Sequence, residues 1–73
     1  MHSIELRLRG DHIALDALLK ACGLAPSGGA AKAMIAAGEV KVDGEPELRR
    51  GRKLRAGAVV EAGGLRVRVE PPQ

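Results

Sequence analysis

The chain contains no Phe, Tyr or Trp among its 73 residues. A domain of this length buries a modest share of its surface, so its stability has to come from a few well-packed positions. Leu, Val, Ile, Ala and Met must therefore form the core, and we expect one domain over residues 1–73 without a buried catalytic cavity. The same absence excludes proteins that bind nucleic acids by stacking bases on aromatic rings.

The charge balance favours a polyanionic partner. Twelve Lys and Arg residues oppose nine Asp and Glu residues, which gives a formal net charge of +3. The single Cys22 has no partner for an internal disulfide and favours a reducing compartment. The sequence shows no signal segment and no apolar run of about 20 residues. We expect a cytoplasmic monomer without membrane contact.

The first third of the chain predicts a strand and a helix. Apolar and charged residues alternate over residues 3–9, which is typical of a half-buried strand, and Gly10 ends the pattern. Apolar residues then recur at helical spacing over residues 15–22. Asp11 is a candidate N-cap of this helix, and Gly23 fits the position just beyond its end.

A second helix is expected between Ser27, a good N-cap, and Gly38. Gly28 and Gly29 weaken its first turn by up to about 1 kcal/mol each relative to Ala, so they require a reason. Small residues could leave backbone N–H groups open to an anion, or they could permit close helix packing. We favour the packing interpretation. The apolar face of this helix consists of Ala31, Met34 and Ile35.

The remainder predicts short strands. Asp43-Gly44 is a strong signal for a tight hairpin turn, and Pro46 prevents a long strand from following it. Strands at residues 59–61 and 65–69 form a second hairpin, and residues 71–73 form a flexible tail. The fold class is therefore α+β, with two short helices packed on a small, mostly antiparallel sheet.

The densest feature is a basic run in which five positive charges fall within seven positions. A run of this kind is usually a solvated face. This one lies between a turn and a strand, and like charges held close repel each other unless a polyanion neutralises them. The residues alone do not decide between a solvated face and a surface that binds a polyanion. The cations are Arg49, Arg50, Arg52, Lys53 and Arg55, and the acids of the neighbouring turn upstream are Glu39, Asp43, Glu45 and Glu47.

No residue pattern indicates catalysis. Cys22 occupies an apolar helix position with no His near it in sequence, so we interpret it as a small core residue. His2 and His12 do not show the ligand spacing of a zinc site. Ser27 lacks a nucleophile–base pattern around it. We expect a non-enzymatic protein without a metal or a cofactor.

The segments ALDALLKACGLAPSGGAAKAMIAAGEVKVDG and KLRAGAVVEAGG resemble the S-four (S4) RNA-binding domain, named for a ribosomal small-subunit protein. The resemblance covers about residues 11–70 and is closest to the small, stand-alone, bacterial YbcJ-like branch. Many members carry Arg at the starts of both helices, where this chain has Ala14 and Gly28. The residues that match the family pattern are Ser27, Ala31, Lys32, Ile35, Gly38, Val40, Lys41, Val42, Asp43, Gly44, Leu54, Gly57 and Val59.

The resemblance implies an αL RNA-binding motif, formed by the helix pair and the adjacent hairpin, that contacts structured ribosomal or transfer RNA. It also implies association with the ribosome. An A-form helix is recognised by shape and phosphates, which a basic surface without aromatics can do. The alternative is a protein-interaction adaptor built on the same scaffold. The candidate RNA-binding residues are Ser27, Lys32, Lys41, Arg49, Arg50, Arg52, Lys53 and Arg55.

Overall fold

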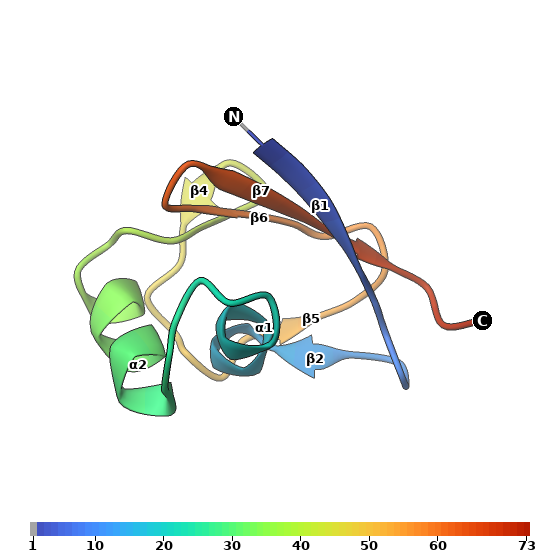
Figure 1. Cartoon of the computed structure of the whole chain (residues 1–73), viewed down its shortest axis with the longest axis horizontal. Coiled ribbons are helices and arrows are strands. Elements are labelled where there is room, and N and C mark those ends of the chain that lie inside the picture. Colours follow the sequence, from blue (N-terminus) through green and yellow to red (C-terminus); the bar gives the residue numbers. More distant parts are fainter. Residues whose placement is uncertain (1) are drawn as a thin grey trace.

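A computed structural model describes residues 2–73 and places two helices on one side of a small sheet (Figure 1). This arrangement confirms the predicted α+β fold with two short helices and a mostly antiparallel sheet. None of the helices in the described part of the chain is long and apolar enough to cross a membrane. The elements are β1 (His2–Arg7), β2 (Ile13–Ala14), α1 (Leu15–Ala21), α2 (Gly28–Ala36), β3 (Lys41–Val42), β4 (Glu45–Pro46), β5 (Lys53–Leu54), β6 (Val59–Ala62) and β7 (Leu65–Glu70).

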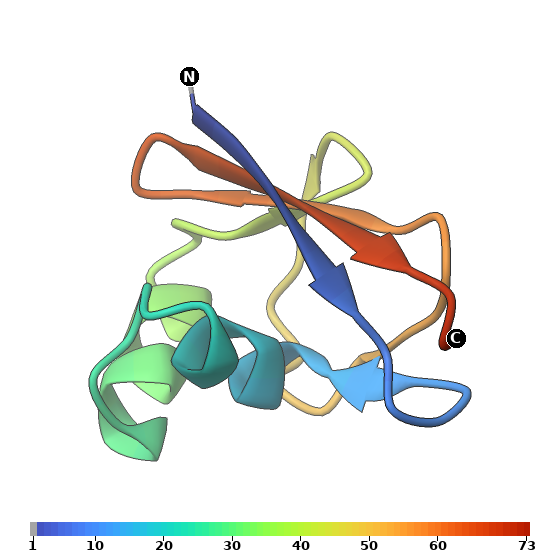
Figure 2. The ribbon, with the colours of Figure 1, turned by 45° about the vertical axis from the view of Figure 1, so that its right-hand side comes forward.

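The main sheet has the strand order β1-β7-β6-β3-β4. All its neighbours are antiparallel except β1 and β7, which run parallel with Ile4 opposite Val67 (Figure 2). This pairing joins the first strand of the chain to the last. A separate two-stranded sheet pairs β2 with β5 and lies beside α1 (Figure 1).

The predicted first strand is present but shorter and more exposed than the alternating pattern indicates. It ends at Arg7, two residues before the predicted end, and Ile4 is 37% exposed. The cause is its place at the edge of the sheet, where only one side of β1 has a neighbouring strand. Leu8 lies beyond the strand and is buried, because its backbone N–H still donates to the Glu70 carbonyl oxygen at 3.0 Å.

The helix ends follow the sequence signals with one exception. The Ser27 hydroxyl accepts a hydrogen bond from the Ala30 N–H at 3.1 Å, which confirms it as the N-cap of α2. The prediction that Asp11 caps the first helix is wrong. The helix begins at Leu15, with Ala14 in the cap position and no side-chain cap. Asp11 lies outside the helix, with its carboxylate beside the His12 ring and the Arg55 guanidinium.

The packing interpretation of Gly28 and Gly29 is also wrong. A Cβ atom added at Gly28 would meet no heavy atom within 4 Å. One added at Gly29 would meet only the Ser27 hydroxyl oxygen, at 3.9 Å. Close packing therefore does not require either glycine.

The Asp43-Gly44 turn forms as predicted. Both residues have positive φ, 52° and 87°, which is the geometry of the two-residue turns that join twisted strands. Asp43 also ties this hairpin to the next strand, because its carboxylate accepts a hydrogen bond from the Val59 N–H at 3.0 Å. The turn and the strand β6 are thus held in fixed register.

The core is aliphatic, as the composition predicts. It lies between the helices and the sheet. Cys22 is half-buried and packs against this core, in agreement with its interpretation as a small core residue. The largest fully buried side chains are Leu15, Leu18, Leu19, Ile35, Val40, Leu54, Val60, Val67 and Val69.

Candidate nucleic-acid interface

The basic run lies in residues 47–55, which follow β4 and include β5. We call these residues the basic segment. Its backbone is fixed to the start of α1. The N–H groups of Leu15 and Asp16 donate to the carbonyl oxygens of Arg52 and Arg50, at 2.9 and 3.0 Å. The first N–H groups of a helix lack partners within the helix. Carbonyl oxygens of the basic segment supply partners for two of these N–H groups, so α1 begins without a side-chain cap at Ala14.

The pairing of β5 with β2 holds the C-terminal part of the basic segment. Lys53 lies opposite Ala14, and Leu54 lies opposite Ile13. Ala14 is a position at which many relatives in the S-four family carry Arg. The register therefore places a lysine beside the site from which that positive charge is missing.

A buried carboxylate holds the N-terminal part of the basic segment. The Glu47 side chain is only 10% exposed, and its Oε1 accepts a hydrogen bond from Arg52 Nη1 at 2.8 Å. Its Oε2 accepts from Arg49 Nε at 3.3 Å and from the Arg49 backbone N–H at 3.2 Å. The Glu47 backbone N–H donates to the Val40 carbonyl oxygen at 3.0 Å. We call these three charged groups, Glu47, Arg49 and Arg52, the Glu47 clamp.

Sequence reasoning missed the Glu47 clamp and treated Glu47 as part of an acidic turn. A signal was present, because this carboxylate stands two residues before Arg49 and five before Arg52. Two of the five cations therefore neutralise a buried carboxylate. A third, Arg55, forms an exposed ion pair with Asp11 at 3.3 Å.

Arg50 and Lys53 differ from the other cations of the basic segment. Both are exposed, and neither forms an ion pair or a side-chain hydrogen bond with any residue from 2 to 73. Arg49 also remains 76% exposed despite its contact with Glu47. Two shallow surface depressions share Arg52 and Lys53 among the residues that line them. Arg49, Arg52 and Lys53 line the first depression and Arg52, Lys53 and Arg55 line the second, whereas Arg50 lines neither.

The other predicted site residues lie elsewhere. The Ser27 hydroxyl is occupied as the N-cap of α2, and Lys32 is exposed on the same helix. Lys41 is exposed on β3, opposite Glu61 of β6. Within residues 2–73 none of the three shares an ion pair or a side-chain hydrogen bond with the basic segment. Their assignment to the interface stays a prediction.

Two arginines of the main sheet, Arg66 and Arg68, are paired with carboxylates. Arg66 lies 3.6 Å from a carboxylate oxygen of Glu61, and Arg68 lies 3.5 Å from one of Glu5. Exposed pairs of this kind contribute little stability, but they cancel charge locally. The main sheet also carries cations without a carboxylate partner, since Arg7 and Lys41 form no ion pair within residues 2–73, but the basic segment is where five cations fall within seven positions. No cluster of three or more His, Cys, Asp or Glu side chains that could hold a metal ion occurs in the described residues.

The Glu47 clamp predicts a specific pH dependence. Hydrogen bonds from Arg49 and Arg52 lower the pKa of Glu47 from 4.5 to about 2. A carboxyl group with a depressed folded-state pKa stabilises the fold above pH 4.5, and this contribution is lost as the pH falls toward 2. The midpoint of thermal unfolding should therefore be lower in Glu47→Gln than in the unmodified chain at pH 7, and the difference should vanish near pH 2.

Circular dichroism melts between pH 7 and pH 2 would measure this difference. Glu45→Gln is the matched control, since Glu45 is exposed and makes no ion pair within residues 2–73. Its midpoint should follow that of the unmodified chain at every pH. A Glu47→Gln deficit that persists unchanged down to pH 2 would show that the carboxylate charge is not what holds the segment.

Comparison with known proteins identifies relatives of this chain. The model of the family described as the S4 domain matches residues 6–70. "Putative RNA-binding protein YbcJ" of Escherichia coli is 47% identical over 58 residues, which cover 80% of this chain and 83% of that protein. "Probable ribosome maturation protein RlbA" of Bacillus subtilis is 48% identical over 53 residues, covering 73% and 75% of the two chains.

A solved structure also matches. The solution structure of YbcJ from Escherichia coli, described as revealing an αL motif involved in RNA binding, superposes with a TM-score of 0.67 and 41% identity. The match covers 96% of this chain and 87% of the other. The resemblance in the sequence, the matched family and the shared fold have one explanation: the chain belongs to the S4 domain family.

Proposed function

We propose that this chain binds structured RNA through the basic segment and acts as a binding protein rather than an enzyme. One observation carries the proposal. The backbone of the basic segment is fixed by α1, β2 and Glu47, while Arg50 and Lys53 have no carboxylate partner within residues 2–73. A fixed array of cations loses less conformational entropy on binding phosphates than a mobile one.

The chemistry of the surface favours phosphates over bases. The chain has no aromatic side chain on which a base could stack. Duplex RNA is recognised largely through its shape, its phosphates and its 2′-hydroxyl groups. In this proposal Lys53 replaces the charge missing at Ala14, and Arg49 contributes its exposed guanidinium. Lys32 and Lys41 extend the contact, and the Ser27 hydroxyl serves chiefly as the cap of α2.

The names of the relatives guide the choice of RNA. One relative is named as an RNA-binding protein and another as a ribosome maturation protein. We therefore propose ribosomal RNA as the first ligand to test and transfer RNA as the second. In this proposal the protein works in the cytoplasm on ribosomal particles.

A salt titration tests the proposal. Six phosphate contacts, from the five cations of the basic segment and Lys41, give a slope of log affinity on log salt of about −5. If Arg52 and Arg55 stay with their carboxylates, four contacts give about −3.6. Fluorescence anisotropy with labelled duplex RNA should thus show a loss of roughly 150- to 1,000-fold between 50 and 200 mM salt.

Parallel titrations with ribosomal RNA fragments and transfer RNA would rank the two ligands. An affinity that does not change with salt would contradict the proposed phosphate contacts. The adaptor alternative has its own signature. A partner protein that stays bound after nuclease treatment and at high salt would favour it.

A further inference from the structure

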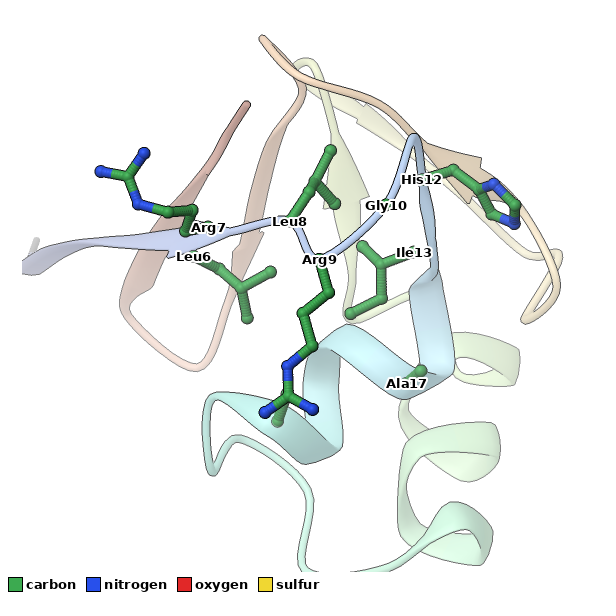
Figure 3. Close-up of a pocket in the computed structure, with 9 residues that line it drawn as sticks. Leu6, Arg7, Leu8, Arg9, Gly10, His12, Ile13 and Ala17 are labelled. Atoms are coloured by element: carbon green, nitrogen blue, oxygen red, sulfur yellow. The ribbon is translucent and has the colours of Figure 1, made fainter. Parts of the chain in front are cut away.

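A second surface adjoins the end of the basic segment, because Ile13, which lines it, lies opposite Leu54 in the β2–β5 pair. A groove with a volume of about 570 Å³ runs between α1 and the chain that leaves β1 (Figure 3). Its apolar wall comes from Leu6, Ile13, Ala17 and Ala21. None of the residues that line it also lines the two depressions of the basic segment.

The groove adjoins an open sheet edge. β1 is the terminal strand of the main sheet, and within residues 2–73 no strand pairs with its outer side. An edge of this kind presents unpaired backbone N–H and C=O groups to another chain. Most of β1 is exposed, including the apolar side chain of Ile4. The edge is thus available for the addition of one more strand.

The two features fit a single ligand. Side chains alternate between the faces of a strand, so a segment paired with β1 would direct every second side chain toward the helix side. Leu6 of β1 points in that direction, and Ile13 reaches into the same space (Figure 3). A paired segment with apolar residues at alternate positions would place one or two of them in the groove. Main-chain hydrogen bonds would supply the rest of the contact.

The charges at the rim favour an acidic segment. No carboxylate lines the groove, and of its basic lining residues Arg9 is the one whose side chain turns toward α1 (Figure 3). Arg7 points away and donates to the Pro71 carbonyl oxygen, and the His12 ring contacts the Asp11 carboxylate. Arg9 extends over α1 and forms no ion pair within residues 2–73 (Figure 3). Asp11, the nearest carboxylate in sequence, is held by His12 and Arg55. Complementary charge at a rim speeds association and excludes partners of the wrong sign.

A nucleic acid suits this groove less well than a protein does. An extended peptide can pair its backbone with the outer edge of β1 and place apolar side chains against the Leu, Ile and Ala wall, whereas the phosphates of a nucleic acid use neither feature. We infer that the outer edge of β1 and the adjoining groove bind an extended, acidic protein segment with apolar residues at alternate positions. The chain would then join RNA on one surface to a protein on the other.

Nuclear magnetic resonance tests this inference, since every amide of the isotope-labelled chain reports separately. The probe is a capped nine-residue peptide in which Val and Glu alternate. It should shift the amides of residues 2–13 and 17–21 and leave those of residues 47–51 of the basic segment unchanged. A peptide of the same composition with its valines grouped together should bind roughly tenfold more weakly, because it cannot place alternate valines in the groove.

Two variants locate the site. Arg9→Glu reverses the charge at the rim, and Ala17→Glu puts a carboxylate into the groove, so each should raise the dissociation constant of the alternating peptide about tenfold or more. Ala33→Glu is the matched control, because Ala33 is exposed on α2 and does not line the groove. Its dissociation constant should equal that of the unmodified chain, and each amide spectrum also shows whether the variant is folded.

Three results would overturn the inference. The alternating peptide could fail to shift the β1 amides at millimolar concentration. It could bind Arg9→Glu as tightly as the unmodified chain. Finally, a duplex RNA could shift the groove amides where the peptide does not, which would assign the surface to nucleic acid. The peptide experiment contains no RNA, so its failure would leave the proposed RNA binding untouched.

Discussion

The double variant Arg50→Glu/Lys53→Glu should lose RNA binding while keeping the fold of the chain. Both side chains are exposed and lack carboxylate partners within residues 2–73, so their replacement breaks no ion pair. Two lost phosphate contacts make the salt slope about 1.8 shallower and weaken binding at 0.1 M salt by on the order of 60-fold. Two added carboxylates repel phosphates and increase the loss further.

Anisotropy titrations with duplex RNA would measure the affinity, and circular dichroism would confirm the fold. Arg7→Glu/Arg9→Glu is the matched control, because it changes the net charge equally at exposed positions outside the basic segment. It should keep RNA affinity within about threefold of the unmodified chain, since it removes no proposed phosphate contact. Equal losses in the two variants would mean that overall charge, not the position of the cations, drives binding.

Replacing only Arg50 and Lys53 tests RNA binding more cleanly than replacing four cations. From the sequence alone, changing Arg49, Arg50, Arg52 and Lys53 to Ala looks like a way to remove binding without harm to folding. The structure shows that the change would also take both side-chain partners from the buried Glu47. A buried carboxylate without partners destabilises the fold, so loss of binding and loss of structure would be confused.

Leu54→Ala should destabilise the chain by about 2–5 kcal/mol, the usual result of removing a fully buried leucine side chain. Leu54 lies on β5, between Lys53 and Arg55 of the basic segment, and is only 1% exposed. The whole domain should have a stability of about 4–11 kcal/mol at this length. The midpoint of thermal unfolding should therefore fall by about 10 °C or more.

Leu48→Ala provides the control, since it is the same substitution within the same segment. Leu48 is 65% exposed, so its loss should change the stability by no more than about 0.5 kcal/mol. Urea unfolding of both variants measures the two effects on one scale. Similar destabilisation by the two substitutions would contradict the assigned burial and the anchoring role of β5.

Local signals were sufficient to predict most elements of the fold. Ser27 caps its helix through a hydroxyl that lies three residues from its donor, and the Asp43-Gly44 turn needs only its own two backbone conformations. The parallel pairing of β1 with β7 had no such signal, because it joins residues more than 60 positions apart. The cap of α1 was predicted wrongly for a similar reason, since the N–H groups of its first two residues donate to carbonyl oxygens of the distant residues Arg52 and Arg50.

The candidate site was predictable in position but not in detail. Five cations in seven positions are visible in the sequence, and the structure keeps them in one segment. The sequence does not show which of them carry unpaired charge. That depends on whether Glu47 is buried beside Arg49 and Arg52, and its burial depends on how the whole chain packs. The distinction between Arg50 and Arg52 therefore required the tertiary structure.

The parallel pairing of β1 and β7 determines when the main sheet can be completed during translation. Of the strands in residues 2–73, β1 is synthesised first and its partner β7 last. The helix pair, the β3–β4 hairpin and the basic segment all lie between the two and precede β7 in synthesis. A nascent chain interrupted before residue 65 would therefore leave β1 without a neighbour, an unpaired strand open to association with other chains.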